Sequence, residues 1–203
     1  MRTALALSLA AGLWASAASA SPNLNETAPD FTLTDVTGKT HSLQQYKGKT
    51  VVLEWLNHGC PFVTKHYESG NLPKLQKDAT AKGVVWLSIV SSAAGKQGYY
   101  PPAEQAELAK KKGSAATAVL LDEPGAVGHL YGARTTPHMF VIDPQGVLRY
   151  AGAIDSIAST DTDDIKRAEP LAAEAIDAVL SGKAPKQQAS KPYGCSVKYK
   201  GNT

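Results

Sequence analysis

Apolar residues recur along the chain with two spacings, one typical of strands and one of helices. Residues 29–43 alternate apolar and polar positions on either side of a turn at 35–38, which predicts a β-hairpin. The apolar runs 50–56 and 84–90 are continuous, and only Glu54 breaks the first of them. Continuous runs of this length predict strands that are buried on both faces.

Helical segments are expected between and after these strands. Pro61 in a first turn and Ser69 with Gly70 at the end predict a short helix directly after Cys60. A helical stripe of apolar residues runs over 163–182, with Pro170 placed to kink it. The remaining expected elements are helices at 72–83, 101–113 and 125–133, a short strand at 118–122, and a second hairpin at 135–154.

This order of elements predicts the fold class. Strands alternate with helices, and a hairpin and a last helix follow, so we expect an α/β protein with a central mixed sheet flanked by helices on both faces. Beyond Gly182 the chain is rich in Lys, Gln, Pro and Ser, which predicts an arm without much regular structure. We therefore divide the chain into residues 1–20, a domain over 21–182, and an arm over 183–203.

Residues 1–20 have the features of a secretory signal peptide. Arg2 provides a positive start, residues 4–14 are mostly apolar, and Ala18-Ser19-Ala20 is a small-x-small cleavage site. A membrane anchor is the alternative, but it needs about 20 apolar residues. We expect cleavage and a periplasmic or secreted protein, with no membrane attachment afterwards.

Composition and charge exclude some functions. Loss of 20 of the 203 residues leaves 183, and loss of Arg2 lowers the net charge from +3 to +2. Nothing in this balance points to nucleic acid, and Lys110–Lys112 is more typical of a solvated helix end. Export would place both cysteines in an oxidising compartment, where a disulfide can persist.

Cys60 has the sequence surroundings of a reactive thiol. It lies at a predicted helix start, where unpaired N–H groups and the helix dipole favour the thiolate, the form that attacks disulfides and peroxides. Gly59 permits a sharp turn that leaves the sulfur uncovered, and Pro61 suits the first helical turn. The alternative is an inert, buried cysteine.

Cys195 is the second of the two cysteines, and it lies on the predicted arm. A flexible arm can reach far over a domain at little extra entropic cost, so Cys195 could attack an oxidised Cys60 as a resolving cysteine. A permanent Cys60–Cys195 disulfide and a disulfide between chains are the alternatives.

Three segments together resemble the thioredoxin-fold redoxins. They are "APDFTLTDVTGKTHSLQQYKGKTVVLEWL", the Cys-Pro pair that opens a helix after that strand, and "TTPHMFVIDPQG". Within this group the chain is similar to the alkyl hydroperoxide reductase/thiol-specific antioxidant proteins and to the exported thioredoxin-like reductases of cytochrome maturation. The resemblance covers about residues 28–181 and implies a thioredoxin-like fold.

The resemblance also implies roles for individual residues. Cys60 matches the nucleophile, Thr136 and Pro137 match the loop with a cis proline that faces the sulfur, and Glu54 matches a buried carboxylate that transfers protons. The alternatives are a trans Pro137 at a strand start and a Glu54 that pairs with a lysine near the sheet edge. The implied activity is that of an oxidoreductase acting on disulfides or hydroperoxides with an external thiol reductant and no cofactor.

The chain departs from both families at the site. A thioredoxin-like protein has its second cysteine where this chain has Val63. Peroxiredoxins have Thr or Ser where this chain has Asn57, and an arginine where it has Pro137. These departures leave the specific reaction open between disulfide exchange and peroxide reduction.

Two other readings stay open at this point. Cys60 with His58, His66 and His138 is a set of side chains that suits copper or zinc, although the Cys-x3-Cys motif of thioredoxin-fold copper chaperones is missing and a helix would turn His66 away from Cys60. The second alternative is a redox-inactive binding domain that a permanent disulfide stabilises.

Overall fold

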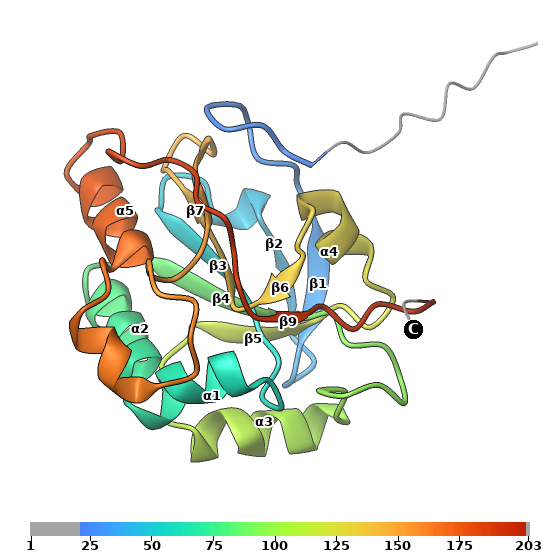
Figure 1. The fold of residues 1–203 in the computed structure, drawn as a ribbon. Coiled ribbons are helices and arrows are strands. Elements are labelled where there is room, and N and C mark those ends of the chain that lie inside the picture. Colours follow the sequence, from blue (N-terminus) through green and yellow to red (C-terminus); the bar gives the residue numbers. More distant parts are fainter. Residues whose placement is uncertain (1–20, 202–203) are drawn as a thin grey trace, which may run out of the picture.

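The computed structural model describes residues 21–201 and contains one large mixed sheet between helices (Figure 1). The predicted signal peptide lies outside these residues. The sheet has the order β2-β1-β5-β4-β3-β7-β8. Its strands are β1 (Thr32–Asp35), β2 (Thr40–Ser42), β3 (Val51–Trp55), β4 (Val85–Val90), β5 (Ala118–Leu121), β7 (His138–Ile142) and β8 (Leu148–Gly152).

The middle of the sheet explains the continuous apolar runs in the sequence. Strand β3 pairs in parallel with β4 and antiparallel with β7, and every residue of β3, β4 and β7 is buried. The strands therefore need apolar side chains on both faces. Strands β1 and β2 form the predicted hairpin, and β7 and β8 form the second.

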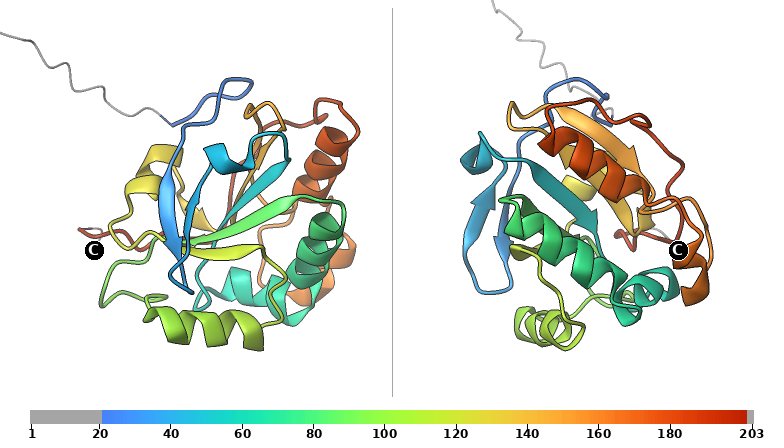
Figure 2. Two further views of the ribbon diagram at one scale, coloured as in Figure 1. Left: turned by 180° about the vertical axis from the view of Figure 1, so that it is seen from behind. Right: turned by 90° about the vertical axis from the view of Figure 1, so that its left-hand side faces the viewer.

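Helices cover both faces of the sheet, as predicted. Helices α2 and α5 lie side by side on one face, and α4 lies on the other (Figures 1 and 2). Val52, Leu72 and Ile176 belong to the first core, and Leu53 and Tyr131 to the second. The helices are α1 (Pro61–Glu68), α2 (Asn71–Ala81), α3 (Pro102–Lys111), α4 (Ala126–Tyr131) and α5 (Leu171–Leu180), with 3-10 turns at Gln44–Tyr46 and Thr162–Lys166. None of the helices within residues 21–201 is long and apolar enough to cross a bilayer.

The last helix differs from its prediction. Instead of one kinked helix over 163–182, the chain forms a 3-10 turn at Thr162–Lys166 and then α5, which begins after Pro170. Proline lacks the N–H that a continuous helix would need and clashes with the preceding turn, so it separates the two elements.

The arm also differs from the flexible tail that its composition suggested. It runs from α5 across the domain and forms strand β9 (Cys195–Ser196), which pairs antiparallel with β6 (Thr135–Thr136) (Figure 1). Val197 and Tyr199 are buried in the core beneath α4. The arm is therefore packed along the part of the domain that holds Cys60.

Candidate functional site: a thiol pair beneath the C-terminal arm

The register of the sheet brings Cys60 and the Pro137 loop together. Trp55, the last residue of β3, lies opposite His138, the first residue of β7. The loop that follows β3 and leads to Cys60 therefore meets the loop that precedes β7 and contains Thr136 and Pro137. The Thr136–Pro137 peptide bond is cis, as the resemblance implied.

Cys60 occupies the N-cap of α1, with extended backbone angles and Pro61 behind it in the first turn. Its sulfur lies 3.1 Å from the carbonyl oxygen of Thr136, which accepts the thiol proton. The sequence suggested an uncovered sulfur, but Cys60 is 0% exposed. The reason is tertiary, because the arm covers this edge of the sheet.

Cys195 lies directly over Cys60. In the β6–β9 pair, Cys195 is the partner of Thr136, the residue that contacts the Cys60 sulfur. Both cysteines are free thiols, and they lie close enough that hydrogen bonding between them shifts the pKa of each. Position 63, where a thioredoxin-like protein would carry its second cysteine, holds the buried Val63. The partner thiol therefore comes from the arm instead of from α1.

Hydrogen bonding makes the two thiols unequal. Burial acts to raise the pKa of Cys60, but hydrogen bonds from the Cys195 thiol and the Val63 amide outweigh it and lower the pKa below that of an ordinary cysteine. Burial and the same bond to Cys60 raise the pKa of Cys195 to about 11. These opposite pKa shifts favour Cys60 as the thiolate and Cys195 as the proton donor.

A close approach at Gly194 seats the arm on the Pro137 loop. Gly194 has a φ of +129°, and a Cβ at this position would clash with the carbonyl oxygen of Thr136. Only glycine fits both requirements. After β9, the Val197 amide donates to the Arg134 carbonyl (3.0 Å) and the Tyr199 hydroxyl donates to the Ala133 carbonyl (2.8 Å).

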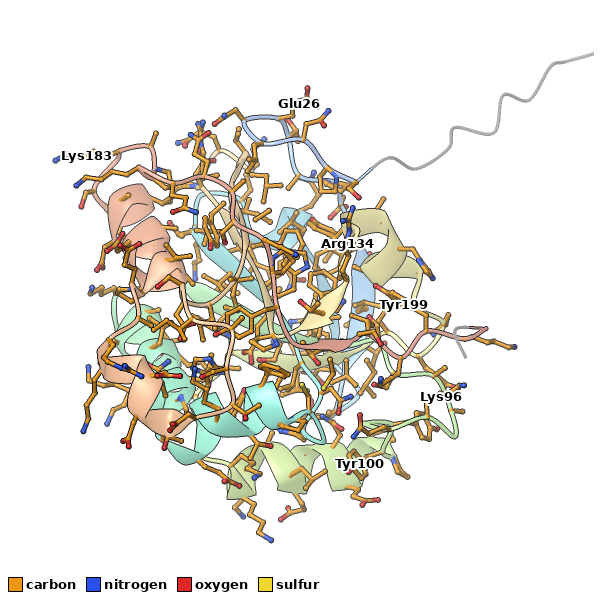
Figure 3. The ribbon with its side chains drawn as sticks, viewed as in Figure 1. Glu26, Lys96, Tyr100, Arg134, Lys183 and Tyr199 are labelled. Atoms are coloured by element: carbon orange, nitrogen blue, oxygen red, sulfur yellow. The ribbon has the colours of Figure 1, made fainter. Side chains whose placement is uncertain are left out.

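The arm is also fixed before Cys195. The Ser190 hydroxyl lies 2.7 Å from the Tyr150 hydroxyl and accepts a hydrogen bond from the Ala153 amide. On the other side of β9, the ring of Tyr199 stacks on His129 of α4 with centroids 4.0 Å apart. Figure 3 shows Tyr199 on the arm beside α4. Cys195 is therefore held between two anchored stretches of chain.

The sequence contained a signal for this strand that composition concealed. Tyr193, Cys195, Val197 and Tyr199 alternate with Gly194, Ser196 and Lys198, the period of a strand with one face buried. The Lys and Pro content of the arm hid that alternation.

Glu54 is completely buried, on the face of β3 that packs against α1 and α2. Four neutral groups donate to its carboxylate: Tyr67 (3.1 Å), Gln76 (2.9 Å), Trp86 (2.7 Å) and Ser88 (2.8 Å). The alternative of a lysine partner is wrong, since no lysine is among these donors. Burial outweighs the four hydrogen bonds and raises the pKa of Glu54.

The three histidines considered as metal ligands with Cys60, namely His58, His66 and His138, have separate partners in the structure. His66 points away from the sulfur, and its ring nitrogens lie near Tyr193 and Asn71. His58 packs edge-on against the Tyr67 ring, and His138 accepts from the Arg134 amide. Within residues 21–201, no three His, Cys, Asp or Glu side chains are grouped as a metal site.

Asn57 has a local structural role in the turn before Cys60. Its side-chain oxygen accepts from the Gly59 amide (2.8 Å) and its amide donates to the Gln97 carbonyl (3.3 Å). The Gln97 side chain closes the same turn by donating to the Gly59 carbonyl (2.9 Å). Asn57 thus shapes the backbone ahead of the thiol with the polar atoms of its side chain.

Several solved structures have a fold similar to that of this chain. The chain is similar to a hypothetical protein of Sinorhizobium meliloti, with 27% identity, a TM-score of 0.73 and coverage of 91% of this chain and 98% of that one. A conserved protein of Geobacillus kaustophilus matches with 28% identity, a TM-score of 0.72 and coverage of 89% and 94%. An exposed lipoprotein thioredoxin of Streptococcus pneumoniae matches with 28% identity, a TM-score of 0.50 and coverage of 68% and 96%.

Sequence comparison identifies the family. A search of curated protein sequences finds no significant match. Residues 24–151, which include β1 to β7, most of β8 and Cys60, match the AhpC/TSA family. The fold is the predicted thioredoxin-like one, with a central mixed sheet flanked by helices. On the sequence match over most of the chain, this protein belongs to the AhpC/TSA family of thioredoxin-like redoxins.

Proposed function

We propose that this protein is a thiol-dependent oxidoreductase in which Cys60 and Cys195 form a reversible disulfide. The observation that carries the proposal is the pairing of β9 with β6, which places Cys195 beside Thr136, the residue whose carbonyl oxygen contacts the Cys60 sulfur. Family membership supports redox chemistry in general. The thiol pair supports an intramolecular, two-cysteine form of it.

A disulfide is the substrate that we favour. The Cys60 thiolate attacks one sulfur of the substrate, a Cys60–substrate bond forms, and the other substrate sulfur leaves as a thiolate. Cys195 then loses its proton and attacks Cys60, so that the second substrate thiolate leaves. The protein is oxidised by two electrons and the substrate disulfide is reduced. An external thiol reductant restores both cysteines.

The turn before Cys60 supports a disulfide over a peroxide. Peroxide cleavage needs donors that stabilise the departing oxygen. At the position of the peroxiredoxin Thr or Ser, the Asn57 side chain is hydrogen-bonded to Gly59 and Gln97, and Pro137 stands in place of the arginine. Neither residue provides the donor that peroxiredoxins have at that position.

A hydroperoxide is the second candidate, and the burial of Cys60 favours it. Cys60 is 0% exposed, so a small molecule needs less movement of the arm to reach it than a protein disulfide does. The thiolate would attack one peroxide oxygen, giving Cys60 sulfenic acid and an alcohol or water. Cys195 would then condense with the sulfenic acid and release water.

Proton transfer and location complete the proposal. Glu54, with its raised pKa and its hydrogen bond to Tyr67 of α1, is the proposed proton store behind the thiol site.

The features of residues 1–20 support export, so the proposed location is the periplasm or the medium. Amino-terminal sequencing of the protein from the periplasm or medium tests this, since intact residues 1–20 would contradict it.

Oxidation of the reduced protein tests the function. It is mixed with one equivalent of glutathione disulfide or of cumene hydroperoxide, and thiols are counted over time. We expect loss of both thiols, a chain lighter by two hydrogens, and a Cys60–Cys195 link in peptide mass spectra. A Cys195→Ser variant should stop at a mixed disulfide or sulfenic acid on Cys60. The proposal would be refuted if the parent protein kept both thiols after treatment with glutathione disulfide and also after treatment with cumene hydroperoxide.

The same experiment separates an enzyme from a stapled domain. A catalytic disulfide should be reduced again by a mild dithiol and should change the melting temperature little. A permanent staple across so long a loop would stabilise the oxidised form by about 3–5 kcal/mol in the chain-entropy model and would resist reduction.

A further inference from the structure

A second buried polar cluster connects α1 to the arm. Lys65 and His66, on the helix that begins after Cys60, have completely buried side chains. Both face Asp155, with Lys65 Nζ 3.9 Å and His66 Nε2 3.8 Å from its Oδ2 atom. Tyr193 of the arm donates its hydroxyl proton to Oδ1 of Asp155. The cluster lies outside the thiol pair and has no part in the chemistry proposed above.

Each hydrogen bond of this cluster has a defined donor and acceptor, from Asn71 through His66 and Tyr193 to Asp155. The Asn71 amide nitrogen lies 2.8 Å from His66 Nδ1, so Nδ1 is the acceptor and the ring proton is on Nε2. His66 Nε2 lies 3.2 Å from the Tyr193 hydroxyl oxygen and donates to it. Burial lowers the pKa of His66 to about 4, which agrees with a neutral ring at neutral pH. The Tyr193 hydroxyl is thus fixed both as a donor and as an acceptor.

The position of Tyr193 makes it relevant to the thiols. It lies two residues before Cys195, and only Gly194, which contacts the Thr136 carbonyl, separates them. Its ring packs edge-on against Phe62 of α1, with centroids 5.8 Å apart. The side chain therefore joins the arm to the same helix whose N-cap is Cys60.

Asp155 receives its side-chain hydrogen bond from the arm. Its Oδ2 atom is buried and has no hydrogen-bond partner among residues 21–201. Its Oδ1 atom accepts from Tyr193 and from the Ile157 amide. A hydrogen bond to a carboxylate is stronger than one between neutral groups. The buried Asp155 carboxylate therefore favours docking of the Tyr193 hydroxyl.

We propose that Tyr193 is a positioning residue, and that Asp155 and His66 hold its hydroxyl as a latch that keeps Cys195 against Cys60 and keeps Cys60 covered. The proposal rests on the Cys60–Cys195 redox pair and deepens it, because the latch sets both the rate of disulfide closure and the access of other molecules to Cys60. A latched arm closes the disulfide quickly, and a released arm exposes Cys60 to larger disulfides.

The test follows both steps with an aromatic disulfide, dithiobis(nitrobenzoate). Attack by a thiolate releases one thionitrobenzoate and leaves a mixed disulfide, and attack by the second cysteine releases the other. The first release measures access to the thiols and the second measures closure. In Tyr193→Phe we expect a faster first release and a second release at least about tenfold slower, the factor that corresponds to 1.4 kcal/mol.

Two further variants serve as controls. Tyr46→Phe removes another tyrosine–histidine hydrogen bond, to His41, far from the arm in the fold, and should leave both releases within twofold of the parent. Asp155→Asn keeps an acceptor but removes its charge, so closure should slow by less than in Tyr193→Phe. Parent-like closure in Tyr193→Phe would overturn the latch, as would equal slowing in Tyr46→Phe.

Hydrogen exchange separates failure of the latch from failure of the proposed function. If the parent releases only one thionitrobenzoate, the redox pair is wrong, and the latch is judged by exchange alone. The Val197 amide, which donates to the Arg134 carbonyl, should then exchange at least about tenfold faster in Tyr193→Phe than in the parent. Unchanged exchange at Val197 in that variant would refute the latch on its own.

Discussion

The two buried carboxylates next to α1, Glu54 and Asp155, are satisfied in opposite ways. Glu54 accepts from four neutral donors, all of which belong to α1, α2 and β4. Asp155 instead has two basic side chains, Lys65 and His66, at 3.9 and 3.8 Å, and its tyrosine donor comes from the arm. The Glu54 cluster is complete without the arm, whereas the Asp155 cluster needs the arm to be docked.

This difference indicates where the molecule is built to stay closed and where it can open. Breaking the Glu54 cluster requires separating helices from the sheet, which is close to global unfolding. Breaking the Asp155 cluster requires only that Tyr193 leave. The thiol site thus has two carboxylates near it. Glu54, on the sheet side, keeps its donors in the folded protein, and Asp155, on the arm side, loses its tyrosine donor when the arm moves away.

The largest expected effect is at Glu54. In Glu54→Gln the new amide brings N–H groups to a site that is lined by donors, so at least one buried donor loses its acceptor. We expect the free energy of unfolding to fall by about 2–3 kcal/mol, measured by urea denaturation. Ser88→Ala, which removes one of the four donors, is the matched control and should cost about 1 kcal/mol. A change of under 0.5 kcal/mol in Glu54→Gln would contradict the comparison.

The pH dependence of stability sharpens this prediction. The pKa of Glu54 is raised in the folded protein, so the folded state holds the proton to a higher pH than the unfolded state does. Its contribution is fully present below the ordinary carboxyl value of 4.5 and is lost as the pH rises through the folded pKa. The free energy of unfolding of the parent should therefore fall over this pH window, and that of Glu54→Gln should not. The same dependence of the free energy of unfolding on pH in both proteins would show that burial does not raise the pKa of Glu54.

A smaller effect is expected at Gly194, on the arm side. A Cβ at this position clashes with the Thr136 carbonyl oxygen, and a φ of +129° is unfavourable for alanine. Gly194→Ala should undock the arm at a cost of about 1–3 kcal/mol and leave the Glu54 cluster intact. Faster proteolysis of the arm, with near-parent urea denaturation of the domain, would be the signature.

Gly182→Ala provides the matched control for this substitution. Gly182 also has a positive φ, +68°, but nothing lies within 4 Å of a Cβ placed there. It should show backbone strain without release of the arm. Equal proteolysis of the arm in both variants would attribute the effect to strain alone.

The smallest effect is expected on the acidity of Cys60. Cys195→Ala removes the hydrogen-bond donor and should raise the pKa of Cys60, while Cys195→Ser keeps a donor and should change it less. In the Cys195→Ser protein, the rate of alkylation at Cys60 should rise with pH to a midpoint below the ~8.5 of a free cysteine. A midpoint that is the same in both variants would exclude Cys195 as the cause.

The fold was accessible from the pattern of residues because its elements are governed by local rules. Continuous apolar runs predicted β3 and β4, Pro61 predicted the start of α1, and the order of elements predicted the mixed sheet. The long helix over 163–182 failed for a local reason, since Pro170 ended one element instead of bending it. Strand β9 was missed because the Lys and Pro content of the arm concealed the alternation of residues over 193–199.

Most of the candidate site was also present in the sequence, though not its assembly. Cys60, Cys195, Glu54, Thr136 and Pro137 were all singled out, and the structure places four of them, all but Glu54, at one edge of the sheet. Lys65, Asp155 and Tyr193 were missed. Each looks like an ordinary surface residue in sequence, because a buried charge is recognised only through the partner that it meets in space.

The sequence by itself determined which chemistry this protein has to work with: two thiols, one at a helix start, and a carboxylate inside a buried strand. Tertiary structure decided which groups meet. The register of β3 against β7 brings the Pro137 loop to Cys60, and the close approach at Gly194 places Cys195 over the same sulfur. Hydrogen bonds and burial depend on distances of a few ångströms between residues far apart in the chain, and only the folded backbone sets those distances.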